Sequence, residues 1–479
     1  MTVAALLGAS DALTPARNQM ALSLGWHIII ACFGMVLPAM IFVLHRRGLR
    51  GDADALEIAK RWSKVGAVLF AIGAVSGTIL SFELGLLWPG LMEQFGDVVG
   101  LAFALEGIAF FTEAIFLGIY VYGWGRLPGR IHSLMLLPIM AAGVIGSFMV
   151  VSVNAWMNAP TGFRVDETGA VVDIDPVAAI FNDHVWYQSA HMYLAAVMVV
   201  GFTLSAVYAF RMLQGHTDRL HRLGAAVPFA FAAFVTPLQP VVGHFAGQRI
   251  ADDQPIKLAA IEALDETESS VPLKLGGLVI DGELRGAIEI PIPGLLSFLA
   301  QNDFDAEVIG LDAVPEDEQP PVGIVHLAYT IMIGIGTALV GLALWGGWRL
   351  MRARRRGREG AWAEMFANRW FLRAIVVAGP AAIIALETGW ITTEVGRQPW
   401  IVHRVMRTED AVTDAGYIWV TLAVLVVVYA GMTVGALATI ASMSRRWAAG
   451  EKDLATPYGP APETGIADPG GTDGGSTES

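Results

Sequence analysis

Two carboxylates inside a long apolar stretch are the first residues of this sequence that could do chemistry. The segment LEGIAFFTEAIF (105–116) carries Glu106 and Glu113, seven residues apart. On a helix this spacing places both side chains on one face, about 10 Å from each other. Because a charged side chain in lipid is costly, such residues usually face a bundle interior or a water-filled path. Placed there, two carboxylates are suited to proton transfer.

Histidine and methionine side chains inside other apolar stretches add a second kind of chemistry. His27 and His191 lie several residues inside such stretches, Met332 lies about ten residues into another, and Glu394 lies at the outer end of a fourth. Histidine with methionine is an axial ligand pair of low-spin haem that raises its reduction potential. The remaining histidine and the carboxylate could each hold a five-coordinate haem. Taken singly, a core histidine is more often hydrogen-bonded than a ligand, and a methionine more often packs in a core.

The composition indicates which elements must position these side chains. The chain of 479 residues is 54% hydrophobic and 16% charged, with a mean hydropathy of +0.55. Soluble domains carry about 25% charged residues, so a membrane protein is predicted. Nine stretches approach or exceed the roughly 20 apolar residues that span a bilayer. They run over 19–44, 65–90, 100–123, 133–154, 186–212, 223–246, 322–348, 372–395 and 413–443.

Loops rich in Lys and Arg predict how these spans are oriented. Five such loops follow spans one, three, five, seven and nine: 45–50, 125–130, 211–222, 349–358 and 444–447. The positive-inside rule places all five in the cytoplasm. The sequence therefore predicts an all-α integral membrane protein with nine transmembrane helices, the N-terminus outside and the C-terminus cytoplasmic. The candidate ligands and carboxylates then lie in the outer half to middle of the membrane.

Four segments follow from this topology. Residues 1–247 hold spans one to six, 248–320 form a large outer loop, 321–445 hold spans seven to nine, and 446–479 form a cytoplasmic tail. The outer loop contains sixteen Asp or Glu against four Lys or Arg, so most of the net charge of −13 belongs to it. No nucleic-acid surface is implied. Apolar patches alternate with charge in this loop, which predicts that it folds onto the membrane face, whereas the Gly-, Pro-, Ser- and Thr-rich tail is predicted to be disordered.

Six stretches make the sequence similar to a known family. They are RNQMALSLGWH (17–27), EGIAFFTEAIFLGIYVYGW (106–124), NAWMNAPTGF (154–163), HMYLAAVMVVGF (191–202), KLAAIEA (257–263) and GWITTEVGRQPW (389–400). Through them the sequence resembles subunit I of cytochrome bd-type quinol oxidases, over nearly all nine spans and in their order. GRQPW preceded by GW-x-x-x-E is the most specific motif, and KLAAIE in an outer loop is almost as specific.

The resemblance implies three haems: a low-spin haem b, a high-spin haem b, and haem d or a third b-type haem. By resemblance, His191 and Met332 match the two ligands of the low-spin haem b. His27 and Glu394 match ligands of the two haems at the oxygen-reducing site, and the resemblance does not assign His27 to one of them. Glu106 and Glu113 match acidic residues beside those haems, as proton donors and, for Glu106, as a further ligand.

The resemblance also assigns roles near the outer face. Lys257 and Glu262 match the quinol-binding positions of the outer loop, which this family calls the Q loop. Their spacing of five is a poor same-face match on a helix, so we expect them to hold opposite edges of a site. Trp390 and Arg397 match residues packed near haem, and the guanidinium is suited to pair with propionates. The Q loop is of the short kind, and Thr330 stands where some relatives carry an arginine, which weakens propionate pairing there.

The expected function is that of a terminal oxidase subunit in the cytoplasmic membrane of a prokaryote. It would oxidise ubiquinol or menaquinol at the outer face, reduce O2 to water at the buried haem pair, and take protons from the cytoplasm, which generates a proton motive force without pumping. The expected partners are subunit II, small single-helix subunits and membrane lipid.

Two alternatives stay open at this point. A haem b membrane anchor of a quinone-linked dehydrogenase would need the low-spin pair but not Glu394, Glu106 or Glu113. An ion-coupled transporter would explain buried carboxylates, but not GRQPW or the His–Met pair.

Overall fold

The computed structural model of the chain describes residues 12–355 and 360–451, and in this part nine helical spans are long and apolar enough to cross a membrane. The nine predicted spans are thus confirmed. Their elements are α2 (Leu13–Gly48), α3 (Ala53–Leu87), α4 (Pro89–Tyr122), α5 with α6 (Gly129–Leu134, Leu136–Asn158), α8 (Val185–Leu213), α9 through η1 to α10 (Arg219–Val235, Thr236–Leu238, Gln239–Asp253), α13 (Val322–Arg355), α15 (Arg369–Val395) and α17 (Ile418–Ala448).

Most helices extend beyond the apolar stretches from which they were predicted, because local capping residues and prolines determine where they begin. The side chain of Asp52 accepts a hydrogen bond from the backbone of Ala55 and caps α3, and Pro89 occupies the first turn of α4. Helix α4 consequently begins eleven residues before the expected start of span three. Glu113 lies 24 residues after that start and only 9 before the end at Tyr122. Glu113 therefore lies nearer the end of α4 that precedes a basic loop, and its depth in the membrane stays a prediction.

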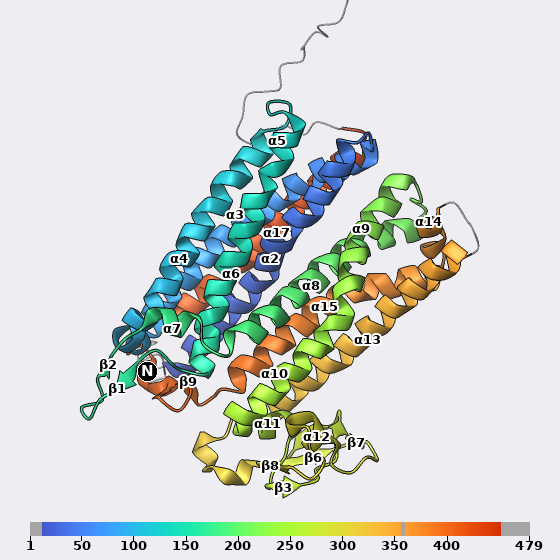
Figure 1. The fold of residues 1–479 in the computed structure, drawn as a ribbon. Coiled ribbons are helices and arrows are strands. Elements are labelled where there is room, and N and C mark those ends of the chain that lie inside the picture. The colour runs from blue at the N-terminus through green and yellow to red at the C-terminus, as the bar shows by residue number, and fades with distance from the viewer. Residues whose placement is uncertain (1–11, 356–359, 452–479) are drawn as a thin grey trace, which may run out of the picture.

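The helices form two bundles that pack side by side (Figure 1). Helices α2, α3, α4, α6 and α17 make the first bundle, and α8, α9, α10, α13 and α15 make the second, with α2 and α6 packing against α8. A buried apolar core runs through both. At the basic-loop end an ion pair joins them, because Arg219 of α9 donates to Asp52 and Asp54 at the start of α3, each at 2.7 Å.

Short elements fill the loops at the opposite end. Three strand pairs lie in the loop between α10 and α13, one lies between α6 and α8, and one follows α15; all are antiparallel. The pairs are β1–β2 (Arg164–Val165, Val171–Val172), β3–β8 (Glu268–Ser269, Glu307–Val308), β4–β7 (Lys274–Leu275, Ile288–Glu289), β5–β6 (Leu278–Ile280, Glu283–Arg285) and β9–β10 (Trp400–Val402, Met406–Arg407). The all-α class is confirmed for the spans, and these two- and three-residue strands are an addition that the helical periodicity did not predict.

The acidic loop folds against the membrane-spanning helices. Its short helices α11 (Pro255–Glu262) and α12 (Leu295–Gln301) bury an apolar cluster that reaches Val325 of α13. Helix α10 runs to Asp253, so this loop begins a few residues later than the predicted boundary at 248. The remaining short helices are α7 (Pro176–Ile180), η2 (Leu311–Ala313), η3 (Glu316–Glu318), α14 (Ala361–Met365) and α16 (Thr408–Ala411).

The two ends of the molecule match the predicted alternation. The start of α2 and the acidic loop lie at one end, and the basic loops lie with the last turn of α17 at the other (Figure 1). Assignment of these ends to the outside and the cytoplasm stays a prediction from the basic loops. The predicted tail begins inside α17, which runs to Ala448, and its part from residue 452 onward lies outside the described residues.

Candidate functional site

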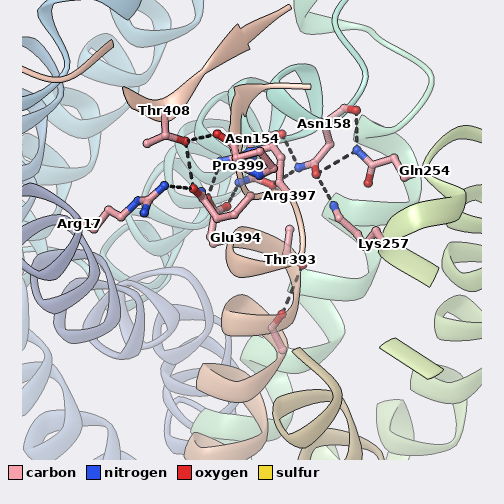
Figure 2. Close-up of polar contacts among 12 residues, drawn as sticks. Arg17, Asn154, Asn158, Gln254, Lys257, Thr393, Glu394, Arg397, Pro399 and Thr408 are labelled. Carbon is pink, nitrogen blue, oxygen red and sulfur yellow. Dashed lines mark hydrogen bonds and ion pairs between the residues drawn. The ribbon is translucent and has the colours of Figure 1, made fainter. Parts of the chain in front are cut away.

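Sequence motifs that lie far apart along the chain meet at the C-terminal end of α15. Gln398 of the GRQPW motif accepts a hydrogen bond from Arg17 of α2 through Oε1, with an N–O distance of 2.7 Å. Glu394, one residue before the end of α15, accepts from Arg397 through Oε2 (2.6 Å) and from Asn154 of α6 through Oε1 (Figure 2). The structure therefore brings together the first, third and last of the motifs that carried the resemblance.

Arg397 is suited to bind an anionic group. Its side chain is 3% exposed, and of its three guanidinium nitrogens only Nη2 has a partner, Glu394. Burying Nε and Nη1 without acceptors costs free energy unless a ligand supplies them. Two free donors on a planar guanidinium match a carboxylate such as a haem propionate.

A chain of side-chain hydrogen bonds connects Glu394 to the acidic loop (Figure 2). Asn158 lies one turn after Asn154 on α6, and its Nδ2 donates to Asn154 Oδ1 at 3.2 Å. Lys257 Nζ donates to Asn158 Oδ1 at 2.5 Å, and Gln254 Nε2 donates to the Asn158 backbone oxygen at 2.6 Å. The sequence analysis assigned no role to the two asparagines, although their spacing of four in NAWMN places them on one helix face.

Lys257 and Glu262 are both buried, with 5% and 8% of their surface exposed. Neither side chain therefore belongs to a solvated loop surface. Burial, followed by the charge of Arg397, lowers the pKa of Lys257 to about 7. Burial raises the pKa of Glu262 to about 7. Both groups thus titrate near neutral pH, which suits them for proton exchange.

A pocket of about 360 Å³, partly open to solvent, lies beside Lys257. Its polar lining residues include Gln254, Lys257, Arg397, Gln398 and His403. Glu262 is not among the lining residues, and the turn of α11 before it is joined to α13, since His326 Nδ1 donates to the Ile261 oxygen at 2.8 Å. The two residues therefore do not hold opposite edges of this pocket.

The surroundings of His27 on α2 leave one ring nitrogen as a possible ligand atom. Nδ1 lies 2.8 Å from the Ser76 hydroxyl of α3, and this hydroxyl itself donates to the Gly73 backbone oxygen at 3.0 Å. The hydroxyl must then accept the Nδ1 proton, which leaves the lone pair on Nε2. Metal-ligating histidines are usually oriented by such a bond at their other nitrogen.

His191 and Met332 lie on α8 and α13, and both helices pack against α15. Nδ1 of His191 is buried and has no hydrogen-bond partner. A Cβ at Gly243 would lie 3.5 Å from the His191 ring, and a Cβ at Gly389 would lie 3.0 Å from Met332 Sδ. Two glycines thus keep backbone close to the two predicted ligands. Trp390, next to Gly389, packs partly buried against the apolar core.

The absence of a side chain at Gly389 gives a sharp prediction. In Gly389→Ala the new methyl group meets the Met332 sulfur at a distance that requires one of them to move. We expect a shifted low-spin haem band and a changed midpoint potential, with protein yield close to wild type. Gly336→Ala on α13, where nothing lies within 4 Å of the new atom, is the matched control. An unchanged spectrum and potential in Gly389→Ala would remove Met332 from the ligand set.

Glu106 and Glu113 lie two turns apart on α4, as predicted. Glu113 points towards α2, because its Oε1 would lie 3.3 Å from a Cβ at Gly34. It lines a second cavity of about 410 Å³, together with Ser63 and Tyr120. This cavity lies between α2, α3, α4 and α6, towards the basic-loop end. Glu106 is half-buried on the same helix, nearer the outer end.

Two further carboxylates were missed by the sequence analysis. Glu387 lies seven residues before Glu394 on α15, its Oε1 is buried without a partner, and its Oε2 faces Gly25 of α2. Glu83 of α3 is buried and accepts from Gln19 at 2.9 Å. The spacing of Glu387 and Glu394 repeats that of the pair on α4, and this was the signal available in the sequence.

The donor set fits axial coordination of haem. Among the described residues no three His, Cys, Asp or Glu side chains converge as they would around a metal ion held by protein alone. The candidate ligands occur singly, and hydrogen bonds orient two of them, His27 and Glu394. His191, Met332, His27 and Glu394 are thus compatible with the haem-ligand roles predicted from the sequence, and Arg397 is compatible with a propionate partner.

Fold and site together define a multi-pass membrane protein with a polar site buried between its helices. Residues 15–447 match the sequence model of the family described as cytochrome bd terminal oxidase subunit I. A cytochrome bd menaquinol oxidase subunit I of Bacillus subtilis is 35% identical over 88% of this chain and 94% of its own length. A cytochrome bd ubiquinol oxidase subunit 1 of the same organism is 28% identical over 88% and 91%.

A solved structure of similar fold leads to the same assignment. The bd oxidase structure from Geobacillus thermodenitrificans matches with a TM-score of 0.83 and 34% identity, over 91% of this chain and 99% of that one. The chain belongs to the family of cytochrome bd terminal oxidase subunit I. It is accordingly a haem-carrying subunit of a terminal quinol oxidase in a bacterial cytoplasmic membrane, where it works with a subunit II.

Proposed function

We propose that the protein oxidises quinol in the pocket beside Lys257 and reduces O2 to water at a haem pair held by His27 and Glu394. The observation that carries this proposal is the hydrogen-bonded chain from Lys257 through Asn158 and Asn154 to Glu394. It joins the pocket that Lys257 and Arg397 line to Glu394, a predicted haem ligand. The names of the relatives include both menaquinol and ubiquinol, so both substrates enter the tests.

Haem bound at these residues supplies electron transfer and oxygen reduction. We assign the low-spin haem b to His191 and Met332, and the high-spin haem b and haem d (or a third b-type haem) to the site of His27 and Glu394. The task of the chain's own residues is then to orient these ligands and to move protons. Ser76 holds the ring of His27, and Asn154 with Arg397 holds the carboxylate of Glu394.

Proton uptake from the cytoplasm is proposed to run through Glu113. The cavity that Glu113 lines reaches Tyr120, two residues before the end of α4, and the Tyr120 hydroxyl lies 2.9 Å from His45 Nδ1. These groups lie towards the basic-loop end, which the positive-inside rule assigns to the cytoplasm. Quinol protons released at the other end would leave outside. The reaction would therefore move charge across the membrane without a pump.

One experiment separates this proposal from its alternatives. The purified complex is examined by a reduced-minus-oxidised optical spectrum and by oxygen consumption with menaquinol or ubiquinol. We expect b-type bands, a further haem that binds carbon monoxide, and quinol-dependent oxygen uptake. A spectrum of low-spin b-type haem alone would indicate a dehydrogenase anchor, and a protein without haem would indicate a transporter.

Lys257 gives a prediction for the quinol step. In Lys257→Ala we expect quinol oxidation to fall about 100-fold, while oxygen reduction from an artificial donor that reduces the haems directly is retained. Glu262→Ala should behave similarly if Glu262 acts on the quinol, although it does not line the pocket. Normal quinol kinetics in both variants would contradict the assignment.

The pKa of Lys257 makes the same step pH-dependent. Because burial lowers this pKa to about 7, the ammonium group loses its proton as the pH rises through about 7. If the charged form donates a hydrogen bond to the quinol, the KM for quinol should increase above that pH. Lys257→Arg stays charged and should flatten the profile. A wild-type KM that is constant between pH 6 and about 9 would remove the charge of Lys257 from quinol binding.

A further inference from the structure

A histidine that the family motifs did not indicate lines the pocket beside Lys257. His403 follows β9, and its backbone N–H donates to the Met157 oxygen at 2.9 Å, which fixes the residue against α6. Both of its ring nitrogens are buried, and neither has a hydrogen-bond partner. Since an unsatisfied buried polar atom costs free energy, a ligand or water in the pocket is the expected partner.

A second histidine connects the same region to the outer solvent. His184, at the N-terminal cap of α8, is 2% exposed, and its Nε2 lies 2.7 Å from Asp253 Oδ2. Its Nδ1 accepts a hydrogen bond from the Tyr187 hydroxyl at 2.7 Å. The side chain of Asp253 is 43% exposed at the end of α10. A buried imidazole bonded to a solvent-exposed carboxylate is an arrangement that can pass protons to water.

Both histidines are anchored around the same turn of α6. His403 binds the Met157 backbone, while Asp253 is followed by Gln254, which binds Asn158 and also lines the pocket. The charge of His184 is one of the causes that lower the pKa of His403. Lys257 interacts electrostatically with both of them.

We infer that His403 accepts the protons released by quinol and that His184 with Asp253 passes them to water at the outer face. This inference rests on the proposed use of the pocket for quinol. Oxidation of one quinol to quinone breaks two O–H bonds and releases two electrons and two protons. The electrons leave to the haems of the oxidase. Each proton in turn forms an N–H bond on His403, moves to the His184–Asp253 pair, and leaves to water.

The charges that face His403 favour this direction. Lys257 faces it from α11, His184 from α8, and Arg397 and Arg404 from its own segment. Burial, followed by these charges, lowers the pKa of His403 to about 4, so the ring is neutral at pH 7 and can accept a proton. A proton placed there is repelled by the same cations and is readily given up.

Charged groups of both signs surround His184. Asp253 and Arg249 face it from α10, and Lys257 faces it from α11. Burial lowers the pKa of His184, and the hydrogen bond to Asp253 raises it in part. The carboxylate therefore makes His184 the better of the two places for a proton in transit.

The test uses the assembled oxidase with its subunit II and haems. In His403→Gln and His184→Gln we expect kcat with quinol to fall about 100-fold, with the KM within about twofold of wild type. Oxygen reduction from ascorbate-reduced tetramethyl-p-phenylenediamine should be retained, as should the haem spectrum. In His403→Gly, added imidazole should restore quinol oxidation. Asp253→Asn should slow the enzyme, whereas Asp252→Asn, at the exposed neighbouring position, should leave the rate unchanged.

Several results would overturn the inference. One is wild-type quinol kcat in both histidine variants. A second is that haem or artificial-donor activity is lost together with quinol activity. A third is that imidazole has no effect on a slow His403→Gly enzyme. Either of these results would assign the histidine a structural role. If instead the wild-type oxidase oxidises no quinol, the proposed function itself fails, which the wild-type assay shows before any variant is compared.

Discussion

Replacement of His191 by alanine or of Met332 by leucine is expected to remove the low-spin haem b spectrum and to abolish quinol oxidation. A six-coordinate low-spin iron needs both of its protein ligands, and these two side chains lie on α8 and α13, which both pack against α15. Loss of an outer-shell partner already costs roughly 10–100-fold in metal affinity, and loss of a ligand should cost more.

The design separates loss of the ligand from loss of the fold. Met→Leu conserves volume and usually costs less than about 1.5 kcal/mol, so membrane insertion and yield of the Met332→Leu chain should be normal. Met351→Leu changes an exposed methionine of the same helix and serves as the matched control. Haem content is measured by the pyridine haemochrome and by the reduced spectrum. A complete low-spin b spectrum in both ligand variants would refute the pair.

Glu113→Gln is expected to give an inactive oxidase that still contains all three haems. Glu113 lines the cavity that extends towards the basic-loop end, and no predicted haem ligand lines that cavity. Glutamine keeps the shape of the side chain and removes the proton that it could deliver. Since proton transfer by a positioned group contributes about 10²–10⁴-fold, oxygen consumption should fall by a similar factor.

Glu106→Gln is expected to have a different effect. Glu106 lies two turns nearer the outer end of α4, the end at which Glu394 is found, where ligation or contact with a haem edge is more natural than proton uptake. We expect perturbed spectra of the oxygen-site haems. Haem stoichiometry and oxygen consumption are measured side by side for both variants. If Glu113→Gln loses haem and Glu106→Gln keeps it, the two roles are reversed.

The spans and the separate motifs could be predicted from the sequence because each is a local signal. Runs of apolar residues gave all nine spans, and GRQPW with KLAAIE gave the residues that meet at the outer end of α15. Helix ends were less predictable, since Asp52 caps α3 within a polar loop and Pro89 begins α4 inside the apolar run that was predicted as the end of span two.

Contacts between distant segments could not be predicted in this way. Asn154 and Glu394 are 240 positions apart, and nothing local to either one indicates that they share a hydrogen bond. The same holds for the bond between His184 and Asp253, which depends on where α10 ends. Glu387 is a different case. Its spacing of seven residues from Glu394 can be read from the sequence, but Glu387 belongs to none of the motifs that carry the resemblance.

The division into two bundles has a consequence for biogenesis. On the proposed assignment, both ligands of the low-spin haem lie in the second bundle, whereas His27 comes from the first and Glu394 from the second. On this assignment the oxygen-reducing centre would be complete only when the second bundle has packed against α2 and α6 of the first. We therefore expect that a nascent chain can bind the low-spin haem before its oxygen-reducing centre has formed. This order would spare the cell superoxide from half-assembled enzyme.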